Sequence, residues 1–229
     1  MAAATPNYSS GNDRFDAEAA QWDTQPEVVK SSAQCLDTLL TKAEQHGIQL
    51  ASSDVLEIGC GTGLLTVPLS SHVASITALD TAQGMITMLD AKLSQNRISN
   101  VRAAVQLLEN PQDPVLQGKQ FDLAVSHLVF HHVPIMKHLV NVMFGTLKPG
   151  GHIWISDFED TGPQALLFHP KAKHAGVERH GLLRQEMHNI LTQVGFKDVH
   201  VFESFRMDKQ VETGETMAFP FLAITGVRP

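Results

Sequence analysis

Residues 54–63 read DVLEIGCGTG, a short apolar run that ends in three alternating glycines, Gly59, Gly61 and Gly63. Glycine lets the backbone turn tightly and lets a ligand approach atoms that a Cβ would shield. The helix expected after this turn presents unpaired N–H groups at its start. The spacing G-x-G-x-G departs from the G-x-G-x-x-G of dinucleotide-binding loops. The stretch therefore predicts a strand, a ligand-binding glycine turn and a helix.

Strands and helices alternate on the C-terminal side of this turn. Apolar runs separated by helical patterns predict βαβ units and a mainly parallel sheet. A pair of β-like runs near the end of the chain has no helix between them, which predicts an antiparallel pair at the sheet edge. The expected strands are 54–58, 75–79, 101–105, 121–125, 152–156, 199–207 and 218–227, and the expected helices are about 64–72, 82–95, 134–147 and 181–194, with a strong turn at 148–151.

The N-terminal side has a different character. Residues 1–12 are rich in Ala, Ser, Asn and Gly and predict a flexible tail. Residues 13–47 have a helical pattern that breaks near Pro26, a residue tolerated at the first position of a helix. Gly47 is expected to end the second helix.

The composition is that of a globular chain of 229 residues, 43% hydrophobic and 18% charged. The net charge is −7 and Lys and Arg form no cluster, which argues against a nucleic-acid partner. The sequence has no signal-peptide core and no run of about 18 apolar residues, so no membrane partner is expected. Two cysteines, Cys35 and Cys60, are too few for a disulfide framework. These features predict a cytoplasmic location and do not specify an oligomeric state.

Asp80 is the next landmark after the glycine turn. It ends the second expected strand, 17 residues after Gly63. A carboxylate at that place faces the crevice at the switch point of the sheet and can accept hydrogen bonds from both hydroxyls of a ribose. The alternative is a cap on the helix that follows. Its position favours the ribose site.

The sequence resembles the class I S-adenosylmethionine-dependent methyltransferases in four segments that follow one another in the same order and at similar intervals. These are VLEIGCGTGLLT (55–66), ALDTAQGMI (78–86), FDLAVSHLVFHHV (121–133) and LKPGGHIWISDF (147–158). A fifth, AAQWDTQPEVVKSSA (19–33), resembles the helical cap of small-molecule methyltransferases of the ubiquinone/menaquinone-biosynthesis-like group.

This resemblance implies an α/β fold: a Rossmann-like, doubly wound sheet of seven strands, mostly parallel with an antiparallel last strand, and an N-terminal helical cap. It implies one methyltransferase domain over residues 13–229 behind the flexible tail. Within it, 13–50 would form the helical cap, 51–158 the cofactor-binding core, 159–181 an acceptor-side lid, and 182–229 the last helix and the antiparallel hairpin.

The resemblance also assigns roles at the cofactor, S-adenosylmethionine. The three glycines would shape the loop beneath its methionine part, and Glu57 would order that loop or meet the amino group. Asp80 would hold the ribose, Met85 would lie against the adenine, and either Gln106 or Glu109 would contact the adenine amino group. The expected cofactor-binding residues are Glu57, Gly59, Cys60, Gly61, Gly63, Asp80, Thr81, Met85, Gln106 and Ser126.

Twelve histidines is a high count for this length. Several should border the crevice at the strand ends, where one of them can act as a base or orient the acceptor, since imidazole titrates near neutral pH. The alternatives are a metal site, for which no ligand spacing such as H-E-x-x-H is present, and ordinary polar packing. No metal is expected. The candidates for the acceptor side or for a base are His127, His131, His132 and His169.

The predicted function is transfer of a methyl group from S-adenosylmethionine to a small-molecule acceptor, mainly through proximity and alignment. The sequence specifies neither the acceptor nor the methylated atom, and it lacks the Asn-Pro-Pro-aromatic motif of enzymes that methylate flipped bases. The alternatives are a protein side-chain methyltransferase, a non-catalytic cofactor-binding protein and a nicotinamide-dependent dehydrogenase. The residues that would either line an apolar pocket or form core are Trp22, Phe130, Phe158, Phe168 and Leu182–Leu183.

Overall fold

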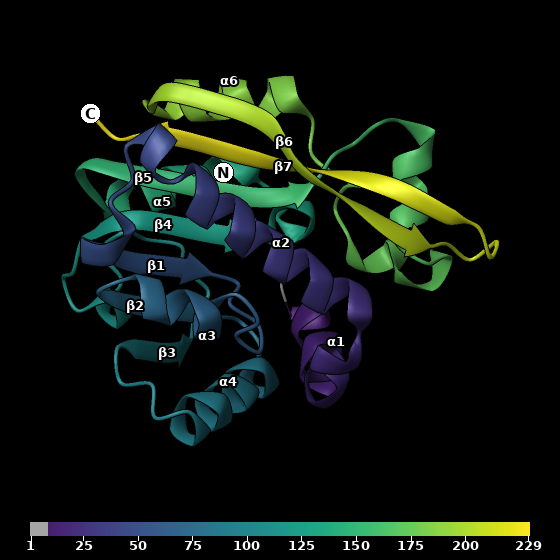
Figure 1. The fold of residues 1–229 in the computed structure, drawn as a ribbon, viewed down its shortest axis with the longest axis horizontal. Helices are drawn as coiled ribbons and strands as arrows, with labels where there is room; N and C mark the ends of the chain where they lie inside the picture. The colour runs from purple at the N-terminus through teal and green to yellow at the C-terminus, as the bar shows by residue number, and fades with distance from the viewer. Residues whose placement is uncertain (1–8) are drawn as a thin grey trace, which may run out of the picture.

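The computed structural model describes residues 9–229, and its strands form one seven-stranded sheet (Figure 1). The five strands from β1 to β5 are parallel, and β7 lies antiparallel between β5 and β6. The predicted Rossmann-like fold is confirmed, with the last strand inside the sheet and the strand before it at the edge. In spatial order the strands are β3 (Val101–Val105), β2 (Ser75–Asp80), β1 (Asp54–Ile58), β4 (Phe121–His127), β5 (Leu147–Phe158), β7 (Thr216–Val227) and β6 (Lys197–Gln210).

Helices cover both faces of the sheet, so the strands carry apolar side chains on both faces. Neighbouring residues therefore enter different cores: Val55 packs with one set of helices, and Leu56 packs with the other. The same division separates Trp154 from Ile153 on β5. One layer contains α2 (Pro26–Lys42), α3 (Thr66–Leu69) and α4 (Gln83–Gln95), and the other contains α5 (Met136–Thr146) and α6 (Arg184–Val194).

The predicted turn at 148–151 is wrong, because these residues belong to strand β5. Gly150 has a φ of +81° and the register between β4 and β5 shifts here, so the segment is an irregular part of the strand. The Gly150 N–H donates to the Arg228 carbonyl at 2.7 Å, and the Arg228 N–H donates to the Gly151 carbonyl at 2.8 Å. The partner comes from the far end of the sequence, which a local turn pattern does not reveal.

The cap begins earlier than expected. Helix α1 spans Ser9–Glu18, so the last four residues of the expected 1–12 tail are helical, while residues 1–8 lie outside the described part of the chain. A 3-10 helix, η1 (Ala19–Thr24), leads to Pro26 at the start of α2. The Asp16 carboxylate accepts a hydrogen bond from the Gly84 N–H of α4 at 2.5 Å, and this contact holds α1 against the core. Tertiary contacts thus outweigh the weak helix propensity of the Ser-Gly-Asn segment.

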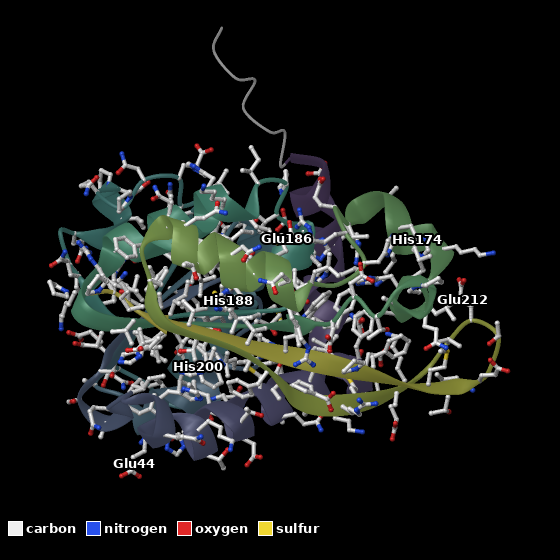
Figure 2. All side chains as sticks on the ribbon, turned by 90° about the horizontal axis from the view of Figure 1, so that it is seen from above. Glu44, His174, Glu186, His188, His200 and Glu212 are labelled. Carbon is white, nitrogen blue, oxygen red and sulfur yellow. The ribbon has the colours of Figure 1, made fainter. Side chains whose placement is uncertain are left out.

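Residues 159–181, the segment predicted to be an acceptor-side lid, pack on an extension of the β6–β7 hairpin. Two short helices, η7 (Pro163–Phe168) and η8 (Lys171–Gly176), lie beside the part of the hairpin that projects past the sheet (Figure 1). A separate apolar cluster joins η7 to the hairpin, and His174 and Glu212 mark this end of the molecule in Figure 2. The cluster consists of Phe158, Phe168, Met207, Val211, Phe219 and Phe221.

The last helix starts later than predicted, at Arg184 instead of Gly181. Gly181 has a φ of +104°, and a Cβ there would lie 2.5 Å from the Asp160 backbone nitrogen. The chain at Leu182 instead forms a short parallel bridge with Glu159. The remaining 3-10 helices are η2 (Glu44–His46), η3 (Leu50–Ser52), η4 (Ser70–His72), η5 (Pro114–Leu116) and η6 (Phe130–His132).

Candidate active site

A cavity of about 480 Å³ lies at the carboxyl ends of the parallel strands, where ligands bind in sheets of this kind. Its walls come from the strand ends, from the cap and from the acceptor-side lid. Within the described chain, Gly63, Ser126, His131 and His169 do not line it. The predicted site residues that do are Glu57, Gly59, Cys60, Gly61, Asp80, Thr81, Met85, Gln106, His127 and His132.

The glycine turn forms the floor of the cavity. The N–H groups of Gly59 and Cys60 both donate to the Leu79 carbonyl, at 2.7 and 3.0 Å, which ties the turn to the end of β2. Gly59 has a φ of +71°, and a Cβ there would lie 2.2 Å from a methyl group of Val129. Gly61 has a φ of +53°. Gly59 therefore requires glycine for the close packing and the left-handed backbone, and Gly61 requires it for the left-handed backbone.

Gly63 has a different role. A Cβ at this position would lie 2.4 Å from Leu89 on α4. The third glycine therefore permits contact between the turn and helix α4, and it acts on the cavity only through that packing.

Asp80 connects the turn to the start of α4. Its two carboxylate oxygens accept hydrogen bonds from the Gly61 and Ala82 N–H groups, at 2.8 and 2.9 Å. Burial raises the pKa of Asp80, and these backbone donors oppose the rise. Asp80 is not the N-cap of α4, because that position is Ala82. The Thr81 N–H is a third backbone donor to this carboxylate. A carboxylate has about four acceptor sites, so the side chain retains some acceptor capacity toward the cavity.

Glu57 lies beneath the glycine turn on β1 and is only 2% exposed. No described residue makes a hydrogen bond of normal geometry to its Oε2 atom. Burial raises the pKa of Glu57 to about 8, the Thr66 hydroxyl opposes this, and the Asp80 charge adds to it. A buried carboxyl without a partner is costly, so its position at the cavity wall is suited to a ligand with a cationic group.

His131 is held in the core by Asp157, which is fully buried at the end of β5. Its Nδ1 lies 2.9 Å from one carboxylate oxygen, and its backbone N–H donates to the other at 3.1 Å. The Phe158 N–H donates to the same carboxylate at 2.9 Å. Burial lowers the pKa of His131 and raises that of Asp157. His131 therefore serves as a neutral donor that orients the loop, away from the cavity.

The other three candidate histidines lie in two different environments. His127 and His132 line the cavity, and burial lowers their pKa values to about 4 and about 3. Neither ring nitrogen of His127 makes a hydrogen bond of normal geometry to the part of the chain that is described. His169 borders a second, outer cavity beside Leu166, with its ring centroid 5.2 Å from that of His131.

Comparison with known proteins agrees with this geometry. Residues 56–155 match the family model described as a methyltransferase domain. Over 156 residues the chain is 25% identical to the ubiquinone biosynthesis O-methyltransferase of Acinetobacter baylyi, covering 68% of this chain and 64% of that protein. It is 31% identical over 148 residues to the malonyl-[acyl-carrier protein] O-methyltransferase of Priestia megaterium, covering 63% of this chain and 50% of that protein.

The fold has solved counterparts. The N-methyltransferase NodS from Bradyrhizobium japonicum, in complex with S-adenosylhomocysteine, superimposes with a TM-score of 0.64 at 21% identity, covering 96% of this chain and 98% of that one. Residues 56–155 therefore match a methyltransferase domain, in a fold that solved methyltransferases share. The chain spans 64% and 50% of the two curated relatives named above. The nicotinamide alternative is therefore set aside.

The cavity fits S-adenosylmethionine in three respects. The glycine turn leaves space that a Cβ would fill, Asp80 retains acceptor capacity for ribose hydroxyls, and the Glu57 carboxyl lacks a partner for an amino group among the described residues. The Gln106 side-chain amide nitrogen donates to Asp113 at 2.9 Å and to the Leu107 carbonyl at 3.0 Å, so the side-chain carbonyl is the group left for the predicted adenine contact. Glu109 also lines the cavity, so both predicted contacts remain.

Ser126 connects two neighbouring strands of the sheet. Its hydroxyl donates to the Ile58 carbonyl at 3.0 Å, and the residue is fully buried between β4 and β1. The Cys60 thiol is buried as well, and burial raises its pKa well above the usual range. Cys60 therefore contributes its backbone to the turn.

The cap contributes residues that were not among the predicted site residues. Arg14 and Phe15 on α1 line the cavity, together with Trp22 of η1. The Asp23 carboxylate accepts from the Thr62 hydroxyl at 2.5 Å and pairs with Lys92, which closes the cap over the glycine turn. The cap segment was recognisable in the sequence, but its contacts with the turn are tertiary.

Of the aromatic and leucine candidates for the apolar wall, Trp22 lines the cavity. Leu183 is 49% exposed on the outside. The others are buried core residues: Phe130, Phe158, Phe168 and Leu182.

No group of three or more His, Cys, Asp or Glu side chains within residues 9–229 could hold a metal ion. No helix in the same range is long and apolar enough to cross a membrane.

Replacing Glu57 with glutamine is expected to stabilise the free protein at alkaline pH. In the wild type the folded pKa of Glu57 is about 8 and the unfolded value is 4.5, so the folded state holds the proton more tightly between these limits. Stability then falls as pH rises through this window, by at most about 1.4 kcal/mol per pH unit. Denaturant titrations should show the E57Q variant gaining on the wild type from pH 5 to pH 8.

The matched control is Glu44→Gln, which changes an exposed glutamate on η2 (Figure 2). Its stability difference from the wild type should not vary with pH. Equal pH profiles for the wild type and E57Q would show that Glu57 is ionised in the free protein.

Proposed function

We propose that this protein transfers the methyl group of S-adenosylmethionine to a small-molecule acceptor bound in the same cavity. The observation that carries this proposal is the shared cavity: the glycine turn, Asp80 and Glu57 form one wall, and His127, His132 and the cap residues form the other. Its volume of about 480 Å³ falls within the usual range for small-molecule sites. The curated relatives named as O-methyltransferases support the reaction class.

Bound S-adenosylmethionine supplies a methyl group already activated on a sulfonium. The protein has to align the acceptor and exclude water. Asp80 and the glycine turn would hold the cofactor from the strand ends. Phe15 and Trp22 supply apolar cover from the cap, and the acceptor-side lid adds Gly176 beside the cap. An alignment mechanism of this kind requires no metal.

The partial cover over the cavity favours a small acceptor over a protein side chain. Residues of α1 and of the lid line the cavity, and these two elements are joined: Lys173 of η8 pairs with Glu18 of α1 at 3.2 Å. A protein substrate would require an open groove at this place. The two free, buried cysteines support the predicted cytoplasmic location.

Calorimetric titration of the full chain tests the cofactor part of the proposal. S-adenosylmethionine and S-adenosylhomocysteine are each expected to bind with micromolar affinity, which corresponds to roughly −8 kcal/mol. NAD should show no heat of binding. A folded protein that binds neither adenosyl compound would refute the proposal, and one that binds both but methylates nothing in a broad acceptor screen would be a cofactor-binding protein without catalysis.

A further inference from the structure

Residues 176–179 of the acceptor-side lid hold the loop that contains His131 and His132. The His132 Nδ1 lies 2.8 Å from the Gly176 carbonyl oxygen. The N–H groups of Glu178 and Arg179 both donate to the His131 carbonyl, at 2.9 and 3.2 Å. The lid and the loop are thus joined by three hydrogen bonds to backbone carbonyls. These bonds hold the loop in place at the cavity.

Arg179 reinforces this attachment with its side chain. Its guanidinium donates to the carbonyls of Phe130 and Val133 at 2.5 and 2.6 Å, and to that of Pro134 at 3.3 Å. These carbonyls flank the histidine pair on both sides. A planar guanidinium reaches several acceptors at once, which a lysine ammonium on a flexible stem does not reproduce. Arg179 is therefore positioned to set the geometry of the loop.

The contact with Gly176 defines which nitrogen of His132 is available. A backbone carbonyl can only accept, so Nδ1 carries the proton. Burial and the nearby His131 and Arg14 disfavour a charged ring, while Asp157 opposes them less strongly. The ring is then neutral, and Nε2 keeps its lone pair. Since His132 lines the cavity beside Phe15, that lone pair is the group it offers to a bound molecule.

We infer that His132 is a catalytic residue whose Nε2 accepts the proton of an acceptor hydroxyl, and that Arg179 is the positioning residue that holds it in place. The acceptor class that follows is a small molecule methylated on oxygen. This inference rests on the proposed function, because it concerns the same cavity.

The step balances without a further reagent. A lone pair of the hydroxyl oxygen forms the new C–O bond, the C–S bond breaks with its electron pair remaining on sulfur, and the hydroxyl proton moves to Nε2 of His132. A weakly basic imidazole is sufficient, because an oxygen that has gained a methyl group while keeping its proton is a very strong acid. The imidazolium charge is then stabilised by the nearby Asp157 carboxylate, and the proton leaves to water.

Paired acceptors test the inference. The probes are phenol, which must lose a proton, and thiophenol, which is largely ionised at about pH 8 and needs no base. His132→Gln should lower kcat/KM for phenol about 100-fold or more and change that for thiophenol by less than about threefold. Arg179→Lys should show the same selectivity with a loss of roughly tenfold for phenol. Affinity for S-adenosylhomocysteine, measured by calorimetry, should stay within about twofold in both variants.

The controls are His188→Gln and Arg206→Lys. His188 lies on the outer side of α6 (Figure 2), and Arg206 is an exposed residue on β6. Both variants should match the wild type on both probes. An equal loss on phenol and thiophenol in the His132 variant would overturn the inference, as would a wild type that methylates thiols or amines but no hydroxyl compound.

A second measurement needs neither turnover nor a variant. In the complex of ¹⁵N-histidine-labelled wild type with S-adenosylhomocysteine, His132 should give the NMR signals of a neutral ring protonated on Nδ1. Signals of the Nε2–H tautomer, or of an imidazolium at pH 7, would overturn the inference. A wild type that binds no S-adenosylhomocysteine would instead refute the proposed function, so the two failures are distinguishable.

Discussion

Replacing Asp80 with alanine is expected to weaken the binding of S-adenosylhomocysteine about 100-fold. The proposed ribose contacts are two charge-assisted hydrogen bonds of about 1.5 kcal/mol each, and the sum of roughly 3 kcal/mol corresponds to about two decades in Kd. Asp80 also anchors the glycine turn through the Gly61 N–H, so the turn itself loses a support. Calorimetry on the full chain measures the change directly.

Asp80→Asn refines the result. An amide keeps one oxygen, so it can retain a backbone contact but cannot accept from both hydroxyls of a ribose. We expect an intermediate loss. Asp90→Ala, which removes an exposed carboxylate on α4, is the matched control and should bind like the wild type. Normal affinity in the folded Asp80→Ala variant would show that Asp80 serves only the backbone of the turn.

Asp157→Ala is expected to destabilise the protein by about 3–5 kcal/mol, the largest effect on folding that we predict. The carboxylate is fully buried and accepts from the His131 ring, the His131 N–H and the Phe158 N–H. Removing one partner of a buried, hydrogen-bonded pair leaves the other groups without compensation. Urea denaturation followed by circular dichroism measures the loss.

Asp157→Asn should cost less, about 1–3 kcal/mol, because its amide nitrogen would face one backbone N–H and leave it unsatisfied. Asp208→Ala removes an exposed carboxylate on β6 and should leave the unfolding midpoint unchanged. If the Asp157→Ala and Asp208→Ala variants unfolded at the same urea concentration, the buried pair would contribute nothing net to stability.

Much of the sheet could be predicted from local patterns. The strands at 54–58 and 101–105 match the structure at both ends, and the strand predicted at 75–79 extends by one residue to Asp80. These strands are apolar runs bounded by turns, a signal contained within a few residues. The errors fall where the partner is distant: residues 148–151 join β5 because they pair with Arg228, and the helix expected at Gly181 starts at Arg184 because Gly181 packs on the Asp160 backbone.

The candidate site divides in a similar way. The glycine turn and Asp80 are adjacent in space because consecutive parallel strands end at the same edge, so their spacing in the sequence predicts their meeting. No such spacing rule predicts where the four candidate histidines lie. His131 points into the core at Asp157, His132 lines the cavity, and His169 borders an outer cavity. Their rings nevertheless lie close together, with centroids 4.0 Å apart for His131 and His132 and 5.2 Å apart for His131 and His169.

The sequence by itself determined the order of strands, the glycine turn and the carboxylate at the end of β2, because each depends on residues close together in the chain. Only the tertiary structure decided which nitrogen of His132 carries a proton, that Arg179 ties the lid to the histidine loop, and that the cap closes on Thr62 and Lys92 through Asp23. These contacts join segments that are between about 40 and 70 positions apart in the sequence. Such long-range hydrogen bonds depend on how the folded elements pack together, and local hydrophobic periodicity does not encode that packing.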